Sequence, residues 1–269
     1  MPDEKHLYRV LTDKRVSLAD EPTDARGSFA DEAEARKELD ELRTRLEELQ
    51  ARLWAESRQA LLVVLQAIDT GGKDGLIRKV LSGVNPTGCT VVSFKVPSEE
   101  ERSHDYLWRI HARVPAFGEI GVFNRSHYED VLVVRVHELV PRDVWEPRYE
   151  QIRRFEEHLV ANGTTIVKLF LHISEDEQKS RFQERLDDPS KRWKFSKADL
   201  EERRSWDEYE AAFQDMVNRT STEDAPWHVI PADRKWYRDV IAARILVETL
   251  ERMDPRYPEP EDLEGVVVD

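Results

Sequence analysis

The sequence predicts an α/β protein in which helices cover both faces of a parallel sheet, and three observations lead to this prediction. Short apolar segments alternate with helical patterns along most of the 269 residues. The apolar segments show no polar alternation, which is typical of strands buried on both faces. One of them, residues 61–68, runs directly into a glycine-flanked lysine, Lys73. Sheets of this kind bind ligands at the carboxyl ends of their strands, so we expect a site there.

Five strands and the helices between them can be assigned in order. The strands are expected at residues 61–68, 90–96, 120–123, 165–173 and 227–230. The helices are expected at residues 31–57, 74–81, 100–113, 142–161 and 236–252, with two more and a basic loop within 175–218. Asn162 and Gly163 supply a stop signal after the 142–161 helix. Strands joined by helical crossovers in this order make a doubly wound domain.

The predicted domain spans residues 31–253. Residues 1–30 are polar and irregular and are interpreted as an N-terminal arm. Residues 254–269 are acidic and contain prolines, so we interpret them as an extended C-terminal tail. Within the domain, residues 186–205 are predicted to form a lid.

The first helix carries leucines at alternating spacings of three and four, which is typical of a helical contact seam. The seam consists of Leu39, Leu42, Leu46, Leu49 and Leu53. It can cover the helix's own domain, or it can meet a second subunit. Both interpretations remain open at this point.

Composition restricts the possible partners. Acidic residues outnumber basic ones, 55 to 41, for a net charge of −14, so a nucleic-acid-binding surface is not expected. A single cysteine, Cys89, excludes a disulfide framework and a cysteine-rich metal site. No stretch reaches the roughly 18 apolar residues of a membrane span, and the N-terminus lacks the apolar core of a signal peptide. We therefore expect a cytoplasmic protein that does not bind membranes.

Residues 69–75 read DTGGKDG and outline a phosphate-binding loop between a strand and a helix. The ordinary loop, G-x-x-x-x-G-K-[ST], surrounds phosphates with backbone N–H groups and ends in a hydroxyl that reaches Mg²⁺. This chain has Ala67 at the first glycine and Asp74 at the hydroxyl position. The groups expected to bind phosphate are Lys73, Asp74 and the backbone of Gly71, Gly72 and Gly75. A tight turn with a solvated lysine is the alternative.

Asp69 lies between Ala67, at the first-glycine position, and Lys73, in the middle of the loop pattern. A carboxylate inside an anion-binding loop repels its ligand unless a divalent cation stands between them. We therefore expect Mg²⁺, or Mn²⁺ in its place, on Asp69. The loop predicts phosphoryl chemistry with a metal-bound phosphate donor or acceptor.

A second polar cluster, residues 124–130, follows the third strand and should face the same crevice. Arg125 can bind phosphate oxygens with two parallel hydrogen bonds. His127 is assigned to phosphate binding as well. The candidate oxygen ligands for Mg²⁺ are Asn124, Glu129 and Asp130. The same segment can also be a helix start that Ser126 caps and Glu129 closes, and both interpretations can hold together.

A third cluster is basic, and it stands out in an acidic chain. Residues 189–197 contain Lys191, Arg192, Lys194 and Lys197 and no acid. Such a run is usually a solvated surface. Between two helices after the fourth strand, however, it is typical of a lid that closes over phosphates and supplies positive charge. Trp193 and Phe195 would pack the lid against its hinge or stack on a base.

Further basic residues follow the second strand. Lys95 is expected at the end of that strand, where it would point into the crevice and bind phosphate. Arg102, Arg109 and Arg113 recur along the predicted helix and could line a groove for a long anion. Surface ion pairs explain these arginines equally well.

Taken together, these motifs make the chain resemble the polyphosphate kinase family 2 from about Leu39 to Met253. The matching motifs are DTGGKDG at 69–75, FKVPS at 94–98, HDYLWR at 104–109, FNRSHYED at 123–130 and KRWK at 191–194. Each motif is short, but all five in this order are specific.

The resemblance implies a thymidylate-kinase-like P-loop fold: a three-layer α/β/α sandwich with a five-stranded parallel sheet and a helical lid. It also implies Mg²⁺-dependent phosphoryl transfer between inorganic polyphosphate and nucleotides such as AMP and ADP, or GMP and GDP. The NRSHYED motif resembles that of the subgroup acting on both nucleoside mono- and diphosphates, with Glu129 as the discriminating residue. A homo-oligomer, dimer or tetramer, is expected from the family and the leucine seam.

The resemblance and the residues suggest one division of labour. Asp69 would hold the metal, Lys73 would bind the phosphates of the nucleotide or the chain end, and Arg125 and Arg192 would stabilise the charge of the transition state. Lys191 and Lys194 would bind polyphosphate. Direct in-line transfer suits these residues better than a phosphohistidine on His127.

Two other classes of protein remain as alternatives. An ATP-dependent nucleoside monophosphate kinase would be expected to keep a hydroxyl where this chain has Asp74. A non-catalytic nucleotide-binding regulatory protein would have no need for a cationic lid. Whether such a site makes or consumes polyphosphate, and which base it prefers, does not follow from the sequence.

Overall fold

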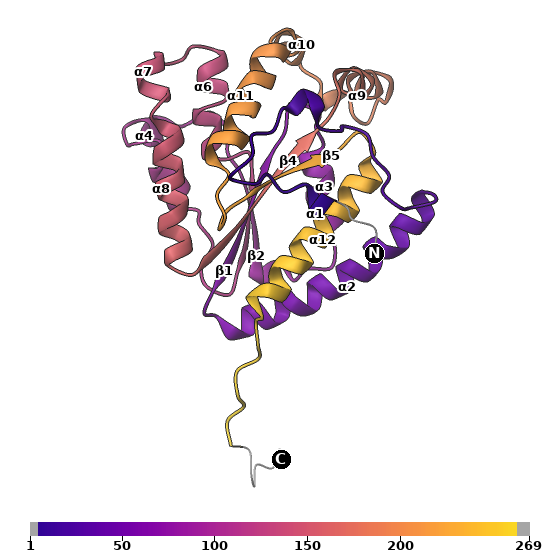
Figure 1. Cartoon of the computed structure of the whole chain (residues 1–269), viewed down its shortest axis with the longest axis vertical. Coiled ribbons are helices and arrows are strands. Elements are labelled where there is room, and N and C mark those ends of the chain that lie inside the picture. The colour runs from indigo at the N-terminus through magenta and orange to yellow at the C-terminus, as the bar shows by residue number, and fades with distance from the viewer. Residues whose placement is uncertain (1–4, 263–269) are drawn as a thin grey trace.

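The computed structural model describes residues 5–262, which form a parallel sheet between two layers of helices (Figure 1). The strand order is β2-β3-β1-β4-β5, and every neighbouring pair is parallel. The strands are β1 Ala60–Gln66, β2 Cys89–Ser93, β3 Ile120–Asn124, β4 Thr164–His172 and β5 Trp227–Pro231. The predicted fold class and all five strands are therefore confirmed.

The helices follow the predicted order with additional short turns. The α-helices are α1 Lys5–Tyr8, α2 Glu32–Glu56, α3 Lys73–Val80, α4 Glu99–Arg102, α5 Trp108–His111, α6 Val133–Val136, α7 Arg142–Trp145, α8 Arg148–Ala161, α9 Glu175–Asp187, α10 Lys197–Arg204, α11 Trp206–Thr220 and α12 Lys235–Met253. The 3-10 turns are η1 Leu18–Asp20, η2 Pro86–Gly88, η3 His127–Asp130 and η4 Arg192–Lys194. In the described residues, no helix is long and apolar enough to cross a membrane.

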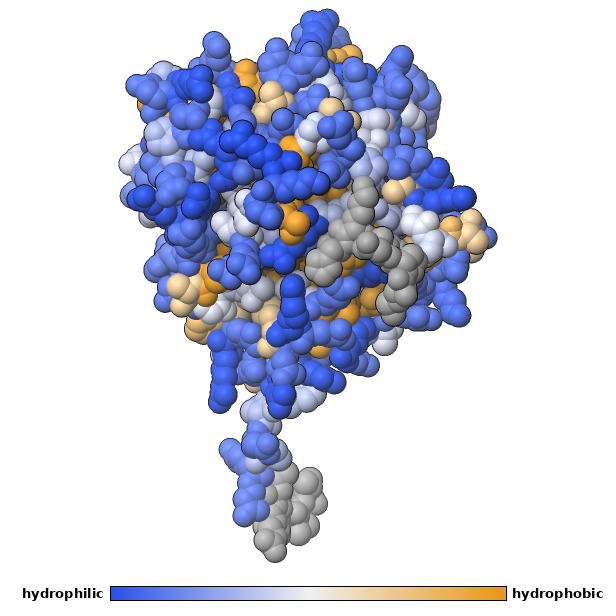
Figure 2. Space-filling model, viewed as in Figure 1, coloured by the Kyte–Doolittle hydropathy of each residue, from blue (hydrophilic) through white to orange (hydrophobic). Residues whose placement is uncertain are grey.

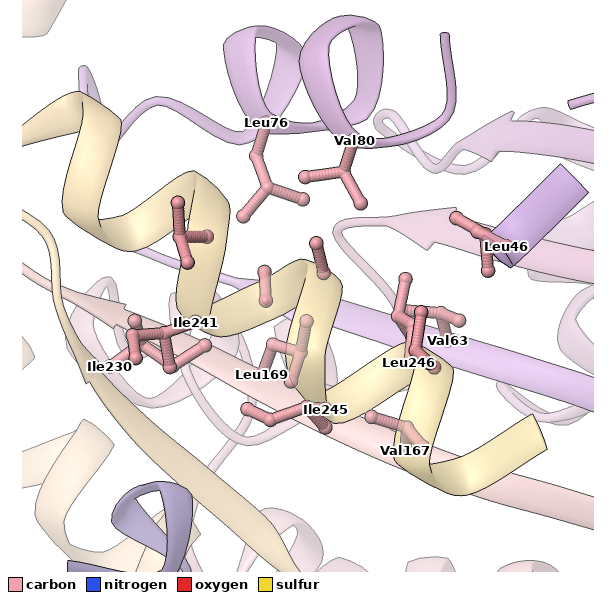
Figure 3. Packing of buried hydrophobic residues seen from close by; sticks show 14 of the residues in the cluster. Leu46, Val63, Leu76, Val80, Val167, Leu169, Ile230, Ile241, Ile245 and Leu246 are labelled. Carbon is pink, nitrogen blue, oxygen red and sulfur yellow. The ribbon is translucent and has the colours of Figure 1, made fainter. Parts of the chain in front are cut away.

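The strand β1 shows how the two layers are built. Leu61, Val63 and Leu65 belong to a core shared with α2, α3 and α12, whereas Leu62 and Val64 belong to a second core under α8 and α11. Successive side chains of a strand point to opposite faces, so a strand that is apolar throughout needs a helical layer on each side. Figure 3 shows the first core, where α12 lies between α3 and strands β1, β4 and β5.

The leucine seam lies on the chain's own domain. Leu39, Leu46, Leu49 and Leu53 are buried in the core that α2 shares with α12. The first of the two interpretations is therefore correct, and this part of the seam has no free apolar surface for a second subunit. Outside the grey residues, the face in Figure 2 is mostly hydrophilic, with apolar residues in small separate spots.

Two segments that were each predicted as one helix are divided into two helices in the structure. The helix expected at 100–113 is divided into α4 and α5, because Asp105 accepts a hydrogen bond from the backbone N–H of Leu107 and forms a turn between them. The helix expected at 142–161 is divided into α7 and α8 at Pro147, which has no N–H to donate.

The N-terminal and C-terminal segments differ from each other. Leu7, Val10, Leu18 and Phe29 are buried, and Val10 donates a backbone hydrogen bond to Trp227 of β5 at 2.8 Å. The N-terminal residues from 7 onwards thus lie along the domain. From 254 to 262 the chain has no helix or strand: Pro255 is still buried, the Arg256 N–H donates to Glu56, and the chain then runs away from the body (Figure 1). The rest of the predicted tail lies outside the described residues.

Candidate active site

The candidate site lies where β1 and β3 end side by side. Leu65 of β1 is in register with Asn124 of β3, so the loop after β1 and the segment after β3 begin at the same edge of the sheet. The backbone N–H of Arg125 donates to the carbonyl of Leu65 at 3.2 Å. The topology therefore brings together the two motifs that are 56 residues apart at Asp69 and Arg125.

The phosphate-binding loop has a tightly constrained backbone. Gly72 has a φ of +98°, and a Cβ there would lie 2.1 Å from the guanidinium of Arg238. A Cβ on Gly71 would lie 2.5 Å from the Cβ of Ala67. Both positions therefore require glycine, the first for its conformation and its neighbour, the second for space.

Lys73 begins α3 and points back into the loop. Its Nζ donates to the carbonyl of Ala67 at 2.8 Å, and the side chain is buried. Burial lowers the pKa of Lys73 to about 8, and the nearby cation Arg125 acts in the same direction. In the part of the chain that the structure describes, no carboxylate accepts a hydrogen bond from Lys73. Its buried ammonium group would therefore gain from an anionic ligand, as expected of a phosphate-binding lysine.

Three side chains that the sequence analysis did not single out support the loop. Gln178 of α9 donates to the carbonyl of Asp69 at 3.1 Å, and Arg181 donates to the carbonyl of Thr70 at 3.0 Å. Arg238 of α12 lies against Gly72 and pairs with Asp239 at 2.6 Å. Arg181 and Arg238 are both buried. In the sequence, these two arginines could be recognised only as charged residues on the apolar face of a helix.

Arg125 connects the two motifs. It lies 2.5 Å from the carboxylate of Asp69 and 3.0 Å from that of Glu129. Burial opposes its charge, but Glu129 and Asp69 together raise its pKa above the ordinary value. Arg125 also has a φ of +62°, an unusual backbone for a non-glycine residue and one that often marks a functional site. Sequence analysis predicted that Asp69, Arg125 and Glu129 face the same crevice.

Asp74 is exposed and lies near the basic segment. It accepts a hydrogen bond from the amide of Asn124 at 2.7 Å, and Lys194 Nζ lies 4.0 Å from its carboxylate. Asp74 of the loop therefore contacts the β3 segment and lies near the basic segment.

The basic segment is exposed and held by few contacts. Lys191 pairs with Asp188 at 3.0 Å, and the Arg192 guanidinium donates to the carbonyl of Leu186 at 2.7 Å. Trp193 is 78% exposed, so it does not pack on a hinge in this structure. Phe195 does pack, edge-on against Phe182 of α9 at a ring distance of 6.1 Å.

The donor set fits a magnesium ion that is shared with substrate phosphates. Asp69 and Glu129 both reach Arg125, and Mg²⁺ in phosphoryl-transfer sites is usually held by one or two carboxylates, with phosphates and water supplying the rest. The described residues contain no group of three or more histidine, cysteine or acidic side chains arranged to hold a metal by themselves. Within the same residues, the buried hydroxyl of Thr70 has no hydrogen-bond partner, which leaves it available in the loop.

Asp130 is placed differently from the other candidate metal ligands. Its carboxylate pairs with Arg148 of α8 at 3.2 Å, and Arg148 in turn lies over the ring of Tyr106. Burial raises the pKa of Asp130 to about 6, although Arg148 acts in the opposite direction. The structure thus gives Asp130 a partner on α8 and does not bring it to Asp69.

The structure contradicts the prediction for His127, whereas phosphate binding by Lys95 stays a prediction. His127 is fully buried, and its Nε2 lies 3.2 Å from Glu156, so it does not face the crevice and cannot touch polyphosphate there. Ser126 caps η3, and the turn that follows directs His127 inward. Lys95 lies beyond the end of β2 at Ser93 and is exposed, and its carbonyl accepts from Arg109 at 2.8 Å. Arg109 itself is buried and does not line a groove.

A small pocket beside Arg125 contains further polar groups that sequence reasoning missed. Its lining includes Asp69, Glu129, Gln178, Glu202 and Tyr209. Tyr209 donates to Glu202 at 2.7 Å, and burial together with this bond raises the pKa of Tyr209. Gln178 accepts from Arg203 of α10 at 2.7 Å, so one side chain connects the helix after the basic segment to the loop carbonyl of Asp69.

The sheet is parallel and doubly wound, and a glycine–lysine loop follows β1. Beside that loop an arginine lies between two carboxylates, and a basic segment lies near it. These features define a kinase of the P-loop type. The chain belongs to the polyphosphate kinase 2 family: the model of that family, described as Polyphosphate kinase 2, matches residues 29–258. The resemblance read from the five motifs is confirmed.

Similar proteins cover nearly the whole chain. An AMP/ADP-polyphosphate phosphotransferase of Meiothermus ruber is 55% identical over 97% of this chain and 98% of its own length. An ADP-polyphosphate phosphotransferase of Rhodopseudomonas palustris is 49% identical over 94% and 91%. The crystal structure of polyphosphate kinase 2 from Arthrobacter aurescens superposes with a TM-score of 0.92 at 44% identity, covering 96% of this chain and 92% of that one.

Proposed function

We propose that this kinase transfers phosphoryl groups from inorganic polyphosphate to AMP and to ADP, or to their guanine counterparts, by direct in-line transfer. One observation carries the proposal: Arg125 is held between the loop carboxylate Asp69 and Glu129, beside Lys73. This arrangement offers cations for two phosphate groups and carboxylates for a shared Mg²⁺. The Meiothermus ruber relative, named for both AMP and ADP, supports the choice of acceptors.

The chain's own residues would divide the work between binding and charge stabilisation. Lys73 and the N–H groups of the loop would bind one phosphate group, where the helix α3 begins. Asp69, with Glu129, would hold Mg²⁺, for which Mn²⁺ can substitute and which would neutralise the phosphate oxygens when bound. Arg125 would stabilise the negative charge that spreads over the transferring group.

The basic segment would supply the remaining contacts. Lys191, Arg192 and Lys194 are exposed and carry the positive charge that a long polyanion requires. Closure of residues 186–205 over the crevice would bring Arg192 to the transferring group and exclude water. No side chain in this arrangement has to form a covalent bond to phosphate.

The test is a donor and acceptor assay. The protein is incubated with Mg²⁺ and long-chain polyphosphate, with AMP or with ADP, and the nucleotides are separated by chromatography. We expect ADP and ATP from AMP, and ATP from ADP. Transfer from ATP but not from polyphosphate would instead assign an ATP-dependent nucleoside monophosphate kinase, and tight nucleotide binding without turnover would assign a regulatory protein.

We also propose a homo-oligomer, a dimer or a tetramer, on the strength of the family resemblance. Because most of the leucine seam is covered by α12, its contacts would have to use another surface. Light scattering coupled to size-exclusion chromatography measures the molar mass directly, and the mass of one 269-residue chain would contradict the proposal.

A further inference from the structure

A buried ionic cluster lies next to the segment that carries Arg125 and Glu129. Lys168 of β4 and Glu156 of α8 pair at 2.6 Å, and both are buried. The hydroxyl of Tyr128 donates to Glu156 at 2.8 Å and lies 3.1 Å from Lys168 Nζ. His127 Nε2 lies 3.2 Å from Glu156 as well. Two consecutive residues of η3 are therefore held by side chains from β4 and α8.

Every hydrogen-bond donor of the Lys168 ammonium group has a partner. Lys168 donates to Glu156, to Tyr128 and, at 2.6 Å, to the carbonyl of Thr220, so all three ammonium protons have acceptors. Although burial opposes the charge of Glu156, the ammonium of Lys168 and the hydrogen bond to His127 hold the pKa of Glu156 below its usual value. Burial lowers the pKa of Lys168, but the carboxylate of Glu156 opposes that shift, so the contacts of the cluster favour a charged pair.

Stability alone is a poor reason for such a pair. Removing two charges from water costs about as much as their attraction returns, and well-packed apolar residues of the same volume are often equally stable or more so. The surrounding core offers apolar neighbours of this kind, among them Phe170 and Val229. A buried pair that contributes little to stability is better explained by the geometry that it imposes.

The segment that the cluster holds has a backbone that needs support. Arg125 has a φ of +62°, and a non-glycine residue keeps such a conformation only where its surroundings determine it. On one side, Gln66 of β1 donates to the hydroxyl of Ser126 at 3.1 Å, and that hydroxyl accepts from the backbone N–H of Tyr128 at 3.2 Å. On the other side, Tyr128 and His127 are held by Glu156.

We propose that Glu156 and Lys168 are positioning residues for phosphoryl transfer. Through Tyr128 and His127 they fix the turn between Arg125 and Glu129, so that both side chains meet the loop carboxylate and the transferring group in one geometry. The inference rests on the proposed function of this site. A displacement of about 1 Å in a group that contacts the transferring atoms can reduce the rate on the order of 10²-fold.

The experiment separates geometry from stability with two opposite changes. Glu156→Leu combined with Lys168→Met removes both charges and keeps apolar volume, so the variant should melt at a higher temperature than a variant in which one of the two charges is left unpaired. Its kcat should nevertheless fall at least about tenfold, with the KM values for nucleotide and polyphosphate within about twofold. Glu156→Gln alone keeps the shape of the side chain and one acceptor oxygen, but it removes the ion pair with Lys168. It should melt at a lower temperature and keep kcat within about threefold.

Two further variants make the result independent of how well the double variant folds. Tyr128→Phe removes only the hydroxyl between Glu156 and Lys168, and it should lower kcat about three- to tenfold with unchanged KM. Ile245→Val lies in the other core, on α12, and serves as the control for a core change that leaves the turn untouched. It should lower the melting temperature and leave kcat as in the wild type.

The outcomes are distinct. A double variant or Tyr128→Phe with wild-type kcat overturns the positioning role and leaves the proposed function intact. A kcat that simply follows the melting temperature across all four variants also overturns it, because a purely structural role predicts that relation. Absence of turnover by the wild-type protein in the same assay overturns the proposed function and this inference together.

Discussion

The two regions that would contact phosphate are held in opposite ways. In the loop of residues 67–75, Lys73 is buried and bonded to the backbone, and the carbonyls of Asp69 and Thr70 are taken by side chains of α9. In the basic segment of residues 189–197, Trp193 is 78% exposed and the side chain of Lys191 is 51% exposed. Lys194 and Asp74, 4.0 Å apart, form the one ion pair found between the two regions in the described residues.

This difference indicates a division between geometry and charge. The loop is set before any substrate arrives, so its groups can act on the transferring phosphoryl without reorganisation. The basic segment has few buried contacts, which is typical of segments that open and close at low cost in free energy. We therefore expect changes in the loop to act mainly on kcat and changes in the basic segment mainly on affinity for polyphosphate.

The largest effect is expected in the loop from Lys73→Met. The variant removes the cation while keeping the length and apolar character of the side chain, so the fold should be retained. Because a single positive charge on the transferring group can contribute 10³-fold or more, kcat/KM should fall on the order of 10³-fold. Steady-state kinetics with polyphosphate and ADP measure this.

A lysine elsewhere on the same helix provides the control for that variant. Lys79 is exposed on α3, and Lys79→Ala should keep kcat/KM within about twofold. If Lys73→Met kept more than about a tenth of the wild-type activity, the loop would not be the phosphate-binding element, and the comparison between the two regions would fail.

The next effect is expected from Asp69→Asn, which keeps the shape of the side chain but removes one of the two carboxylates on Arg125. We expect kcat to fall on the order of 10²-fold and the Mg²⁺ concentration for half-maximal activity to rise. Titration of activity with Mg²⁺ at saturating substrates measures both. An unchanged Mg²⁺ requirement would show that the metal is held by other groups.

The basic segment is tested by replacing Lys191, Arg192 and Lys194 together with alanine. Because each is exposed and contacts a flexible polyanion, KM for polyphosphate should rise at least about tenfold. The dependence of KM on salt concentration should also become shallower, since fewer counterions are exchanged on binding. A large loss of kcat at unchanged KM would contradict the division between the two regions.

The matched control is a triple alanine variant at exposed lysines outside the segment. Lys14, Lys37 and Lys179 are such residues. Their loss changes the net charge of the protein as much as the triple variant of the basic segment does, but KM and its salt dependence should stay near the wild-type values.

The sequence was sufficient to predict the part of the molecule around the phosphate-binding loop. The strands, the loop and the meeting of Asp69 with Arg125 could be predicted, because an apolar run without polar alternation and a glycine–lysine turn each have a local physical cause. Parallel pairing of β1 and β3 then follows from the fold class, and it brings residues far apart in the sequence to one edge.

The errors arise where a side chain's direction depends on tertiary packing. His127 lies in a motif rich in polar residues, yet the turn after Ser126 directs it into a buried cluster with Glu156. Lys168 lies in the middle of an apolar strand, and its acceptors on α8, η3 and α11 make its burial possible. Arg181 and Arg238 support the loop from helices whose sequences show amphipathic patterns and nothing specific to phosphate.

A moderate effect is expected from pH. Burial lowers the pKa of Lys73 from an ordinary 10.5 to about 8, so the cationic form is lost as the pH rises through 8 in the free enzyme. Since kcat/KM reports the ionisation of the free enzyme, it should fall about tenfold for each pH unit above roughly 8. Lys73→Arg, which stays charged, should lack this limb of the profile, and its persistence there would assign the limb to another group.

The smallest effect is expected at Asp130, which belongs to neither region. Its pKa is raised by burial from 3.8 to about 6, so folding favours the protonated form. The stabilising contribution is complete below pH 4 and is lost as the pH rises through 6, which amounts to about 2 to 3 kcal/mol at most. Asp130→Asn stays neutral, so its free energy of unfolding relative to wild type should increase between pH 4 and pH 7. Urea unfolding at pH 4 and at pH 7 measures this difference in free energy. The kcat of Asp130→Asn should fall far less than that of Asp69→Asn. A loss of kcat as large as that of Asp69→Asn would instead place Asp130 among the metal ligands, despite its pairing with Arg148.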